Sequence, residues 1–235
     1  MKPEHRTVAG PTRLRDVAAV AVAIAAVGAS FGAIATAAGL PGWLTVAMSV
    51  LVFAGGSQFM AIGLLAAGAP VAAVAAGLLL NARHLPFGLA VAPVVGDRWW
   101  QRLVGSHLLT DEAVAFTLAE PDPARRHRSF WLTAPAIFVC WNVGTALGVG
   151  LGTTVADPAA LGLDAAFPAG LLALLLPALR EPTVRRCALT GAGVAVLATP
   201  VLPAGLPVLL ALVGLATLAL PGSRRRPAVP DGSRR

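Results

Sequence analysis

The side chains that could do chemistry lie in three short polar islands within an otherwise apolar chain. A polar or ionisable group at membrane depth costs several kcal/mol, so each such group marks a candidate functional site. The islands read FAGGSQF, NARHLPFG and HLLTDEA, and their candidate residues are Gly55, Gly56, Ser57, Gln58, Asn81, Arg83, His84, His107, Asp111 and Glu112.

The first island predicts a helix that opens in the middle of a membrane span. Gly55 and Gly56 each lower helix propensity by about 1 kcal/mol relative to Ala. An opened turn frees backbone N–H groups, which attract a carboxylate at the start of the next half-helix. Ser57 and Gln58 add donors and acceptors, so all four residues are candidate substrate ligands, as in discontinuous transporter helices. The alternative is that the glycines let two helices pack closely.

The second island places an arginine in the middle of a span, where it must pair, hydrate or snorkel. We expect Asn81 and Arg83 to bind substrate. Asn81 and His84 are three residues apart and share a helix face, and Pro86 can kink the helix just beyond them. The alternative is that Arg83 neutralises a buried acid and fixes two helices together.

The third island supplies groups that can carry protons. His107 and Asp111 are four residues apart, which predicts one helical face, and Glu112 diverges from them. Carboxylates and imidazoles in a membrane can exchange protons near neutral pH. Together with His84, these residues are predicted to form a proton path or a site for a substrate ammonium group. The alternative is that 103–119 is a short interfacial or re-entrant helix whose acids face water.

The elements that must position these islands are transmembrane helices. Of 235 residues, 57% are hydrophobic and 12% are charged, with a mean hydropathy of +0.76, which excludes a soluble globular domain. Apolar runs of roughly 20 residues predict an all-α polytopic membrane protein with about 7–8 transmembrane helices. The expected spans are 16–40, 43–67, 71–95, 103–119, 130–153, 165–179, 184–200 and 206–220.

The whole of 16–220 is expected to form one transmembrane domain, between a basic cytoplasmic tail at 1–15 and a disordered basic tail at 221–235. The net charge of +7 comes from basic residues that flank apolar runs, which indicates membrane topology and not nucleic-acid binding. With eight spans, 15 of the 18 basic residues lie on the side of both termini, so this side is expected to be cytoplasmic.

Arg98 and Arg102 are exceptions to that charge bias. They would join the cytoplasmic side if 43–67 and 103–119 were re-entrant, which gives six full spans plus two re-entrant segments.

Several other patterns indicate structure or exclude a function. Two GxxxG pairs, Gly28 with Gly32 and Gly144 with Gly148, are predicted to pack helices together. The cysteines show no disulfide framework and no metal-ligand spacing, so neither a metal nor a cofactor is expected. Ser57 could belong to a nucleophilic triad of an intramembrane hydrolase, but nothing in the sequence positions it against a base.

Taken in order, the three islands resemble the AzlC family, the large subunit of branched-chain amino acid exporters. The resemblance runs from PGWLTVAMSVLVFAGGSQFMAIGLLAAGAP through NARHLPFG and LLTDEAVA to WNVGTALG, and covers roughly 20–220. It implies a permease of the bacterial inner membrane that exports leucine, isoleucine or valine with a small AzlD-like membrane subunit. Pro86 stands where the family usually has a larger residue, and the family does not fix the substrate, so another small solute remains the alternative.

Overall fold

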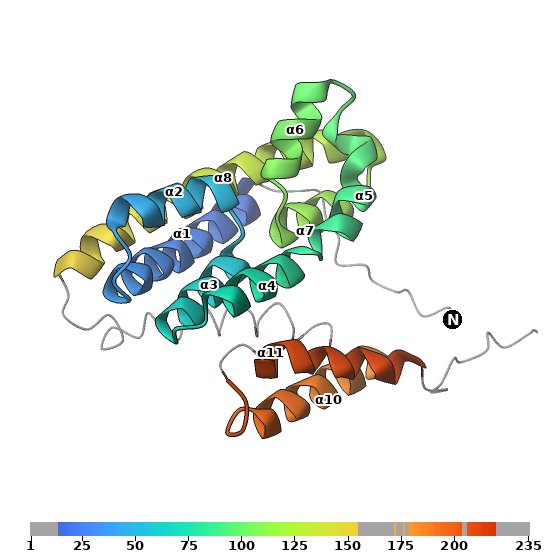
Figure 1. Ribbon diagram of the computed structural model, residues 1–235. Helices are drawn as coiled ribbons and strands as arrows, with labels where there is room; N and C mark the ends of the chain where they lie inside the picture. Colours follow the sequence, from blue (N-terminus) through green and yellow to red (C-terminus); the bar gives the residue numbers. More distant parts are fainter. Residues whose placement is uncertain (1–13, 155–171, 173–175, 177–178, 204–205, 220–235) are drawn as a thin grey trace, which may run out of the picture. The chain divides into compact units, whose positions relative to one another are not determined.

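The computed structural model describes residues 14–154, 172, 176, 179–203 and 206–219, and every regular element among them is helical (Figure 1). They fall into two compact units, which are treated separately. Within residues 14–154, the first unit contains the helices α1 (Leu14–Ala37), α2 (Gly42–Val52), α3 (Gly55–Ala66), α4 (Pro70–Asn81), α5 (His84–Val95), α6 (Trp99–His107), α7 (Asp111–Ala119) and α8 (Pro123–Thr154).

Three stretches in the described part of the chain are long and apolar enough to cross a membrane: α1, α4 with α5, and α8. Ala82 and Arg83, between α4 and α5, keep right-handed helical backbone angles, so Pro70–Val95 forms a nearly continuous rod. The predicted spans 43–67 and 103–119 are each split into two short helices. The all-helical class is confirmed, while four of the eight predicted spans (43–67, 71–95, 103–119 and 206–220) each correspond to two helical elements, so the number of spans stays a prediction.

Helices α1 and α8 run parallel and pack through glycines. A Cβ atom on Gly144 would strike the carbonyl oxygen of Ala25, and one on Gly152 would strike that of Ala33. The residue numbers of the contacting pairs rise together along both helices, so α1 and α8 point in the same direction. Such approach of two backbones is possible only where side chains are absent. The packing role predicted for both GxxxG pairs is confirmed for Gly28, Gly32, Gly144 and Gly148.

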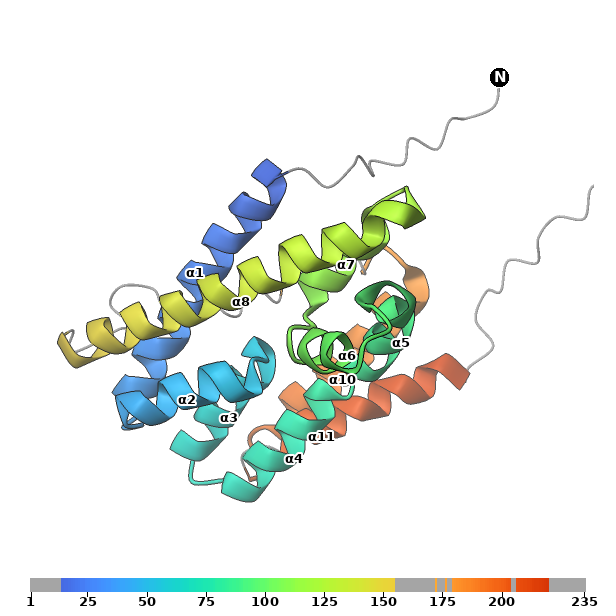
Figure 2. The ribbon, with the colours of Figure 1, turned by 90° about the horizontal axis from the view of Figure 1, so that it is seen from above.

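Helices α2 and α3 form a hairpin that enters from the C-terminal end of α8. Helix α2 is antiparallel to α8, since Gly42 lies against Val149 and the Ser49 hydroxyl donates to Asn142 Oδ1 at 2.8 Å. The chain then breaks, and α3 turns back towards the end where α2 began (Figures 1 and 2). The predicted span 43–67 is therefore a pair of short helices that turn back on each other, and whether it is re-entrant stays a prediction.

The α4–α5 rod runs antiparallel to α8. At its C-terminal end, the carbonyl of Val94 accepts a hydrogen bond from His127 Nδ1 (2.7 Å), and that of Val95 accepts one from Trp131 Nε1 (2.9 Å). Both donors belong to the first three turns of α8. The rod therefore ends beside the start of α8, and the loop that follows it lies at that same end.

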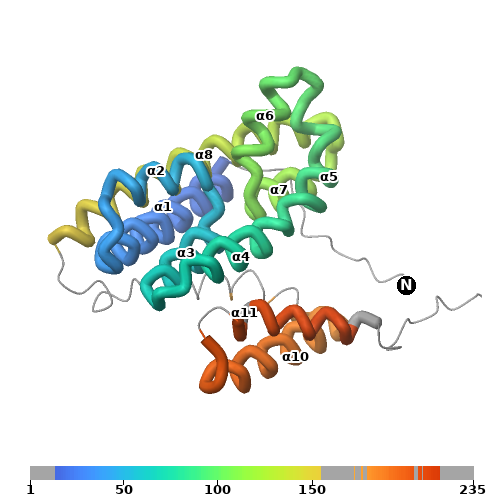
Figure 3. Tube along the Cα trace, in the orientation of Figure 1, coloured from blue at the N-terminus to red at the C-terminus, as the bar shows by residue number. Residues whose placement is uncertain are grey.

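Helices α6 and α7 form a second hairpin, which enters from the N-terminal end of α8. Gly105 on α6 packs against Val95 and Phe130, near that end. On the return, the Phe116 carbonyl accepts a hydrogen bond from Ser129 Oγ at 3.3 Å, again near the start of α8. The tube in Figure 3 shows that the two hairpins approach from opposite ends of α8.

The hydrophobic core of this unit lies where the hairpin tips meet α1 and α8. Phe31 is fully buried, and its ring packs edge-on against Phe59 (5.5 Å) and stacked with Trp141 (5.8 Å between centroids). Phe53 packs on Phe138 at 4.8 Å. Aromatic pairs of this kind contribute about 0.5–1.5 kcal/mol each beyond their buried area, so they fix the depth at which the tips stop.

The second unit contains α10 (Pro182–Ala198), α11 (Leu206–Leu210) and the 3-10 helix η2 (Ala211–Ala219). Helix η2 is antiparallel to α10, because Gly191 lies against Ala211 and Arg186 Nη2 donates to the Thr217 carbonyl at 2.8 Å. The predicted spans 184–200 and 206–220 correspond to these helices. Nearly all of the predicted span 165–179, and both predicted tails apart from Leu14 and Arg15, lie outside the described residues, so the division into domains stays a prediction.

Candidate functional site

The first hairpin breaks at Phe53 and Ala54, just before the glycine pair. Phe53 has φ 41° and ψ 53°, the left-handed conformation, and is the one non-glycine residue of the described chain with positive φ. A side chain in this conformation costs about 1–2 kcal/mol. A break was predicted from the sequence, but its position at Gly55 and Gly56 is wrong, since both glycines lie in the first turn of α3.

The glycine pair permits close approach and not an open turn. A Cβ atom on Gly55 would lie 2.9 Å from the Trp141 ring. One on Gly56 would lie 3.5 Å from Nη2 of Arg83 and 3.3 Å from Leu80. The missing side chains therefore bring the start of α3 next to an indole and a guanidinium group.

Ser57 and Gln58 hold the break together from inside. Ser57 Oγ donates to the Ala54 carbonyl at 2.9 Å, and the Ala54 N–H donates to Gln58 Oε1 at 3.1 Å. Gln58 is fully buried and Ser57 is 4% exposed. No side chain of the described residues caps the first turn of α3, so the free N–H groups of that turn remain available to an anion.

Arg83 joins the long rod to the tip of the second hairpin. Its Nη2 lies 2.8 Å from Oδ2 of Asp111, and both side chains are roughly a quarter exposed (29% and 25%). The same guanidinium group lies beside Gly56 of the first hairpin. The alternative that Arg83 neutralises an acid and ties two helices together is therefore confirmed as a contact, and the partner is Asp111.

Several buried polar atoms around this junction have no hydrogen-bond partner within the described structure. They include the donors Gln58 Nε2, Arg83 Nε and Trp141 Nε1 and the acceptor Asn81 Oδ1. Unpaired buried polar atoms are costly, so a set of four on neighbouring elements requires an explanation. A small ligand that carries both a carboxylate and an ammonium group would satisfy donors and acceptor alike. We call Gly56, Gln58, Asn81, Arg83 and Asp111 the junction cluster.

His107 lies apart from the acid with which it was paired in the sequence. Helix α6 ends at His107 and α7 begins at Asp111, so the prediction that they share one helical face is wrong. The Nε2 atom of His107 donates instead to the Val50 carbonyl at 2.9 Å, and its ring lies 5.7 Å from that of Phe138. His107 thus satisfies one of the free carbonyls at the end of α2 and links the two hairpin tips.

The other predicted proton carriers lie in the first turns of α5 and α7. His84 Nδ1 donates to the carbonyl of Asn81 at 3.1 Å, within its own rod. Asp111 and Glu112 occupy the first turn of α7, where acidic side chains are favoured by the helix dipole. Thr110 caps that helix by accepting from Ala113 N at 3.3 Å. A proton path or ammonium site formed by His84, His107, Asp111 and Glu112 stays a prediction.

The sequence reasoning missed a polar contact between α2 and α8. Ser49 is fully buried and donates to Asn142 Oδ1, with Thr145 Oγ1 at 3.2 Å. Trp141, beside it, supplies the wall against Gly55. The signal was present in the string WNVGT, where a tryptophan, an asparagine and a threonine interrupt an apolar span.

Comparison with known proteins identifies the family. The family model described as AzlC protein matches residues 19–155, which include both hairpins and the whole junction cluster. The chain belongs to the AzlC family. It is also similar to a protein of Bacillus subtilis (strain 168) named branched-chain amino acid transport protein AzlC, with 26% identity over 198 residues that cover 81% of this chain and 77% of that protein. No solved structure matches the chain.

Membership of the AzlC family makes this a multi-pass membrane protein of a transport family and not an enzyme. The structure does not assemble the nominal triad of Ser57, His107 and Asp111. Ser57 donates to the carbonyl of Ala54, and His107 bonds to the carbonyl of Val50, so neither is placed as a nucleophile with its base. The groups of the junction cluster can bind a polar ligand, whose charges can replace the ion pair between Arg83 and Asp111.

Proposed function

We propose that this protein is a permease that exports branched-chain amino acids across the bacterial cytoplasmic membrane. Export is coupled to protons and requires a small AzlD-like membrane subunit. The observation that carries the proposal is the guanidinium group of Arg83, which lies at the tips of both hairpins and is held at 2.8 Å by Asp111. The name of the Bacillus subtilis relative, a branched-chain amino acid transport protein, supports the substrate class.

The junction cluster and its surroundings offer separate contacts for the carboxylate, the ammonium group and the aliphatic side chain of an amino acid. The free N–H groups at the start of α3, Arg83 and the Nε2 atom of Gln58 are donors for the carboxylate. The Oδ1 atom of Asn81 and the carboxylate of Asp111 are acceptors for the ammonium group. The core side chains around Phe31, Phe59 and Ile62 give the aliphatic side chain an apolar surface.

A proton and the substrate ammonium group compete for the Asp111 carboxylate, which pairs with Arg83 while the site is empty. Substrate from the cytoplasm binds to the ionised site, where its ammonium group contacts Asp111 and its carboxylate contacts Arg83. A proton that reaches Asp111 from the outer side removes the negative charge, so the ammonium group loses its acceptor and the substrate leaves outwards. Loss of that proton to the cytoplasm restores the Asp111–Arg83 pair. Proton and substrate thus cross in opposite directions, which is antiport with Asp111 as the carrier, and His84, His107 and Glu112 are candidates for the route to it.

The helix directions support a topology with both termini in the cytoplasm. If α1 starts at the cytoplasmic face, the parallel α8 starts there too, and the α4–α5 rod ends there. Arg98 and Arg102 then join the arginines at 125–128 on the same side. With six full spans and two re-entrant hairpins, every basic residue except Arg83 lies on the cytoplasmic side, as the positive-inside rule expects.

The test is export of labelled leucine, isoleucine and valine from loaded cells that express the chain with and without a candidate small subunit. Faster efflux that requires both chains is the expected result. If no amino acid leaves faster while both chains are present in the membrane, the substrate is another small solute. Asp111→Asn tests the coupling: export that stays unchanged at every pH would exclude Asp111 as the proton carrier.

A further inference from the structure

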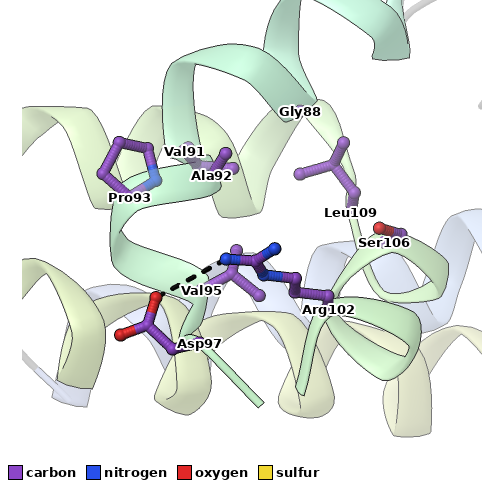
Figure 4. A pocket seen from close by; sticks show the side chains of 10 residues that line it. Gly88, Val91, Ala92, Pro93, Val95, Asp97, Arg102, Ser106 and Leu109 are labelled. Carbon is purple, nitrogen blue, oxygen red and sulfur yellow. Dashed lines mark ion pairs between the residues drawn. The ribbon is translucent and has the colours of Figure 1, made fainter. Parts of the chain in front are cut away.

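A pocket of about 430 Å³ opens between α5 and α6, outside the junction cluster. Its walls are mainly apolar side chains of α5, together with Ser106 of α6 and Leu109 of the hairpin tip (Figure 4). A volume of this size is typical of small-ligand sites and exceeds what one aliphatic amino acid needs. The pocket can therefore hold such a molecule together with some water.

One opposite-charge pair stands at the outer end of this pocket. Arg102 Nη2 lies 3.5 Å from Oδ1 of Asp97, and both side chains are largely exposed (67% and 105%). Arg102 extends across the opening towards Asp97 in Figure 4, and its Nε also donates to the Gly96 carbonyl at 3.3 Å. An exposed pair of this kind contributes about 0–1 kcal/mol to stability, so it is weak as a structural element.

The inner end of the pocket reaches the tip of the second hairpin. Leu109 lines the pocket and lies two residues before Asp111, the partner of Arg83. A Cβ atom on Gly88 would lie 3.7 Å from Leu109, so the rod and the tip are in contact there. The pocket thus extends from the Asp97–Arg102 pair to Leu109, which is two residues along the chain from Asp111.

We propose that the α5–α6 pocket is an access site that takes an aliphatic, zwitterionic amino acid from the aqueous side before it reaches Arg83. This inference rests on the proposed function and adds a second site to it. Asp97 binds the ammonium group and Arg102 binds the carboxylate, which one carbon atom separates in the ligand. The neighbouring wall of Val91, Val95 and Leu109 contacts the aliphatic side chain.

The chemistry of the pocket favours this ligand over singly charged ones. An anion would be attracted by Arg102 but repelled by Asp97, and a cation would meet the reverse. A zwitterion replaces the weak Asp97–Arg102 contact with two opposite-charge contacts of its own. The pocket also lies at the end of α8 that carries Arg125, which is the cytoplasmic end in the proposed topology and the side from which an exporter must load.

The test is a cysteine placed in the pocket. In a Cys140→Ala/Cys187→Ala background, Ser106→Cys is labelled with a membrane-impermeant maleimide in inside-out vesicles that contain the chain and its small subunit. Leucine should slow the labelling several-fold, while leucinamide and 4-methylpentanoate, which each lack one charge, should slow it less. Arg125→Cys, exposed at the same end but outside the pocket, should label at a rate that leucine does not change.

Two further variants assign the protection to the pocket. Asp97→Asn should raise the leucine concentration needed for half-protection by about tenfold, the effect of losing one charge-assisted hydrogen bond. Arg83→Gln/Asp111→Asn removes the charges of the junction cluster without leaving an unpaired ion, and protection should persist in it. Loss of protection in this double variant would overturn the proposal, because the signal would then come from the junction cluster.

Efflux of labelled leucine from cells that express the same pair of chains separates this inference from the proposed function. Leucine that is transported but leaves Ser106→Cys unprotected would refute the access site and leave the permease standing. Leucine that protects without being transported would support the pocket and refute export of this amino acid. If it neither protects nor is transported, both proposals fall.

Discussion

Neutralising Arg83 and Asp111 separately and together should divide their structural role from their role in transport. The pair is about three-quarters buried, between an exposed pair, which contributes up to about 1 kcal/mol, and a fully buried pair, whose disruption costs about 3–5 kcal/mol. We expect Arg83→Gln or Asp111→Asn to cost about 2 kcal/mol each, because each leaves one partly buried charge without its partner. For a chain of this length, that lowers the melting temperature by about 4–8 °C.

The double variant should not add these two costs. Once both charges are gone, no unpaired ion remains, so Arg83→Gln/Asp111→Asn should melt close to either single variant. The resulting coupling energy would be about 2 kcal/mol, within the range for residues in direct contact. Melting of the purified protein in detergent measures it. Arg125→Gln is the control, since its pair with Asp122 at 3.1 Å is exposed and should shift the melting temperature little.

Export should behave differently from stability in this set. Arg83 is proposed to bind the substrate carboxylate, so both variants that lack it should export leucine about 10–100 times less efficiently, the effect of losing a charged hydrogen bond. The measurement is initial efflux at equal amounts of protein in the membrane. Export restored to the wild-type rate in the double variant would refute the reasoning, because the pair would then serve only to hold α7 against the rod.

Three further predictions test the packing, the topology and the contact between the hairpin tips. Gly148→Ala should cost about 1–3 kcal/mol because its Cβ overlaps the α1 backbone, whereas Gly150→Ala, with open space beside it, should be neutral or slightly stabilising; thermal melting of both variants decides this. Cysteines replacing Arg98 and Arg125 should label from the same side of the membrane, and labelling from opposite sides would exclude the re-entrant hairpins. His107→Phe keeps an aromatic ring but loses the hydrogen bond to α2, so it should lower stability by about 0.5–1.5 kcal/mol; unchanged melting would show that this bond contributes nothing.

The sequence predicted the helical class and a break within 43–67, because both follow from local composition. The two re-entrant segments, inferred from the positions of Arg98 and Arg102, stay a prediction. A break was predicted at 55–58 and lies at Phe53 and Ala54, while the interruption at Ala82 and Arg83 precedes the kink that was expected beyond Pro86. The exact break at Phe53 was not predictable, because a left-handed phenylalanine is locally unfavourable. It is stabilised by the packing of Phe53 on Phe138, by the contact of Gly55 with Trp141 and by the hydrogen bonds of Ser57 and Gln58 to Ala54. Tertiary contacts override local propensity there.

The ion-pair partner of Arg83 is likewise decided by tertiary packing and not by spacing along the chain. A continuous helix over 103–119 would have set His107 and Asp111 on one face, since four residues are close to one turn. Residues 108–110 are not helical, so helical periodicity does not relate the faces of α6 and α7. The angle at which α7 returns decides which of its side chains reach Arg83. That angle depends on α8, where Ser129 bonds to Phe116, far from either charge in the sequence. Spacing within one island therefore cannot select between Asp111 and its neighbour Glu112, whereas the packing of two hairpins against a shared long helix selects Asp111.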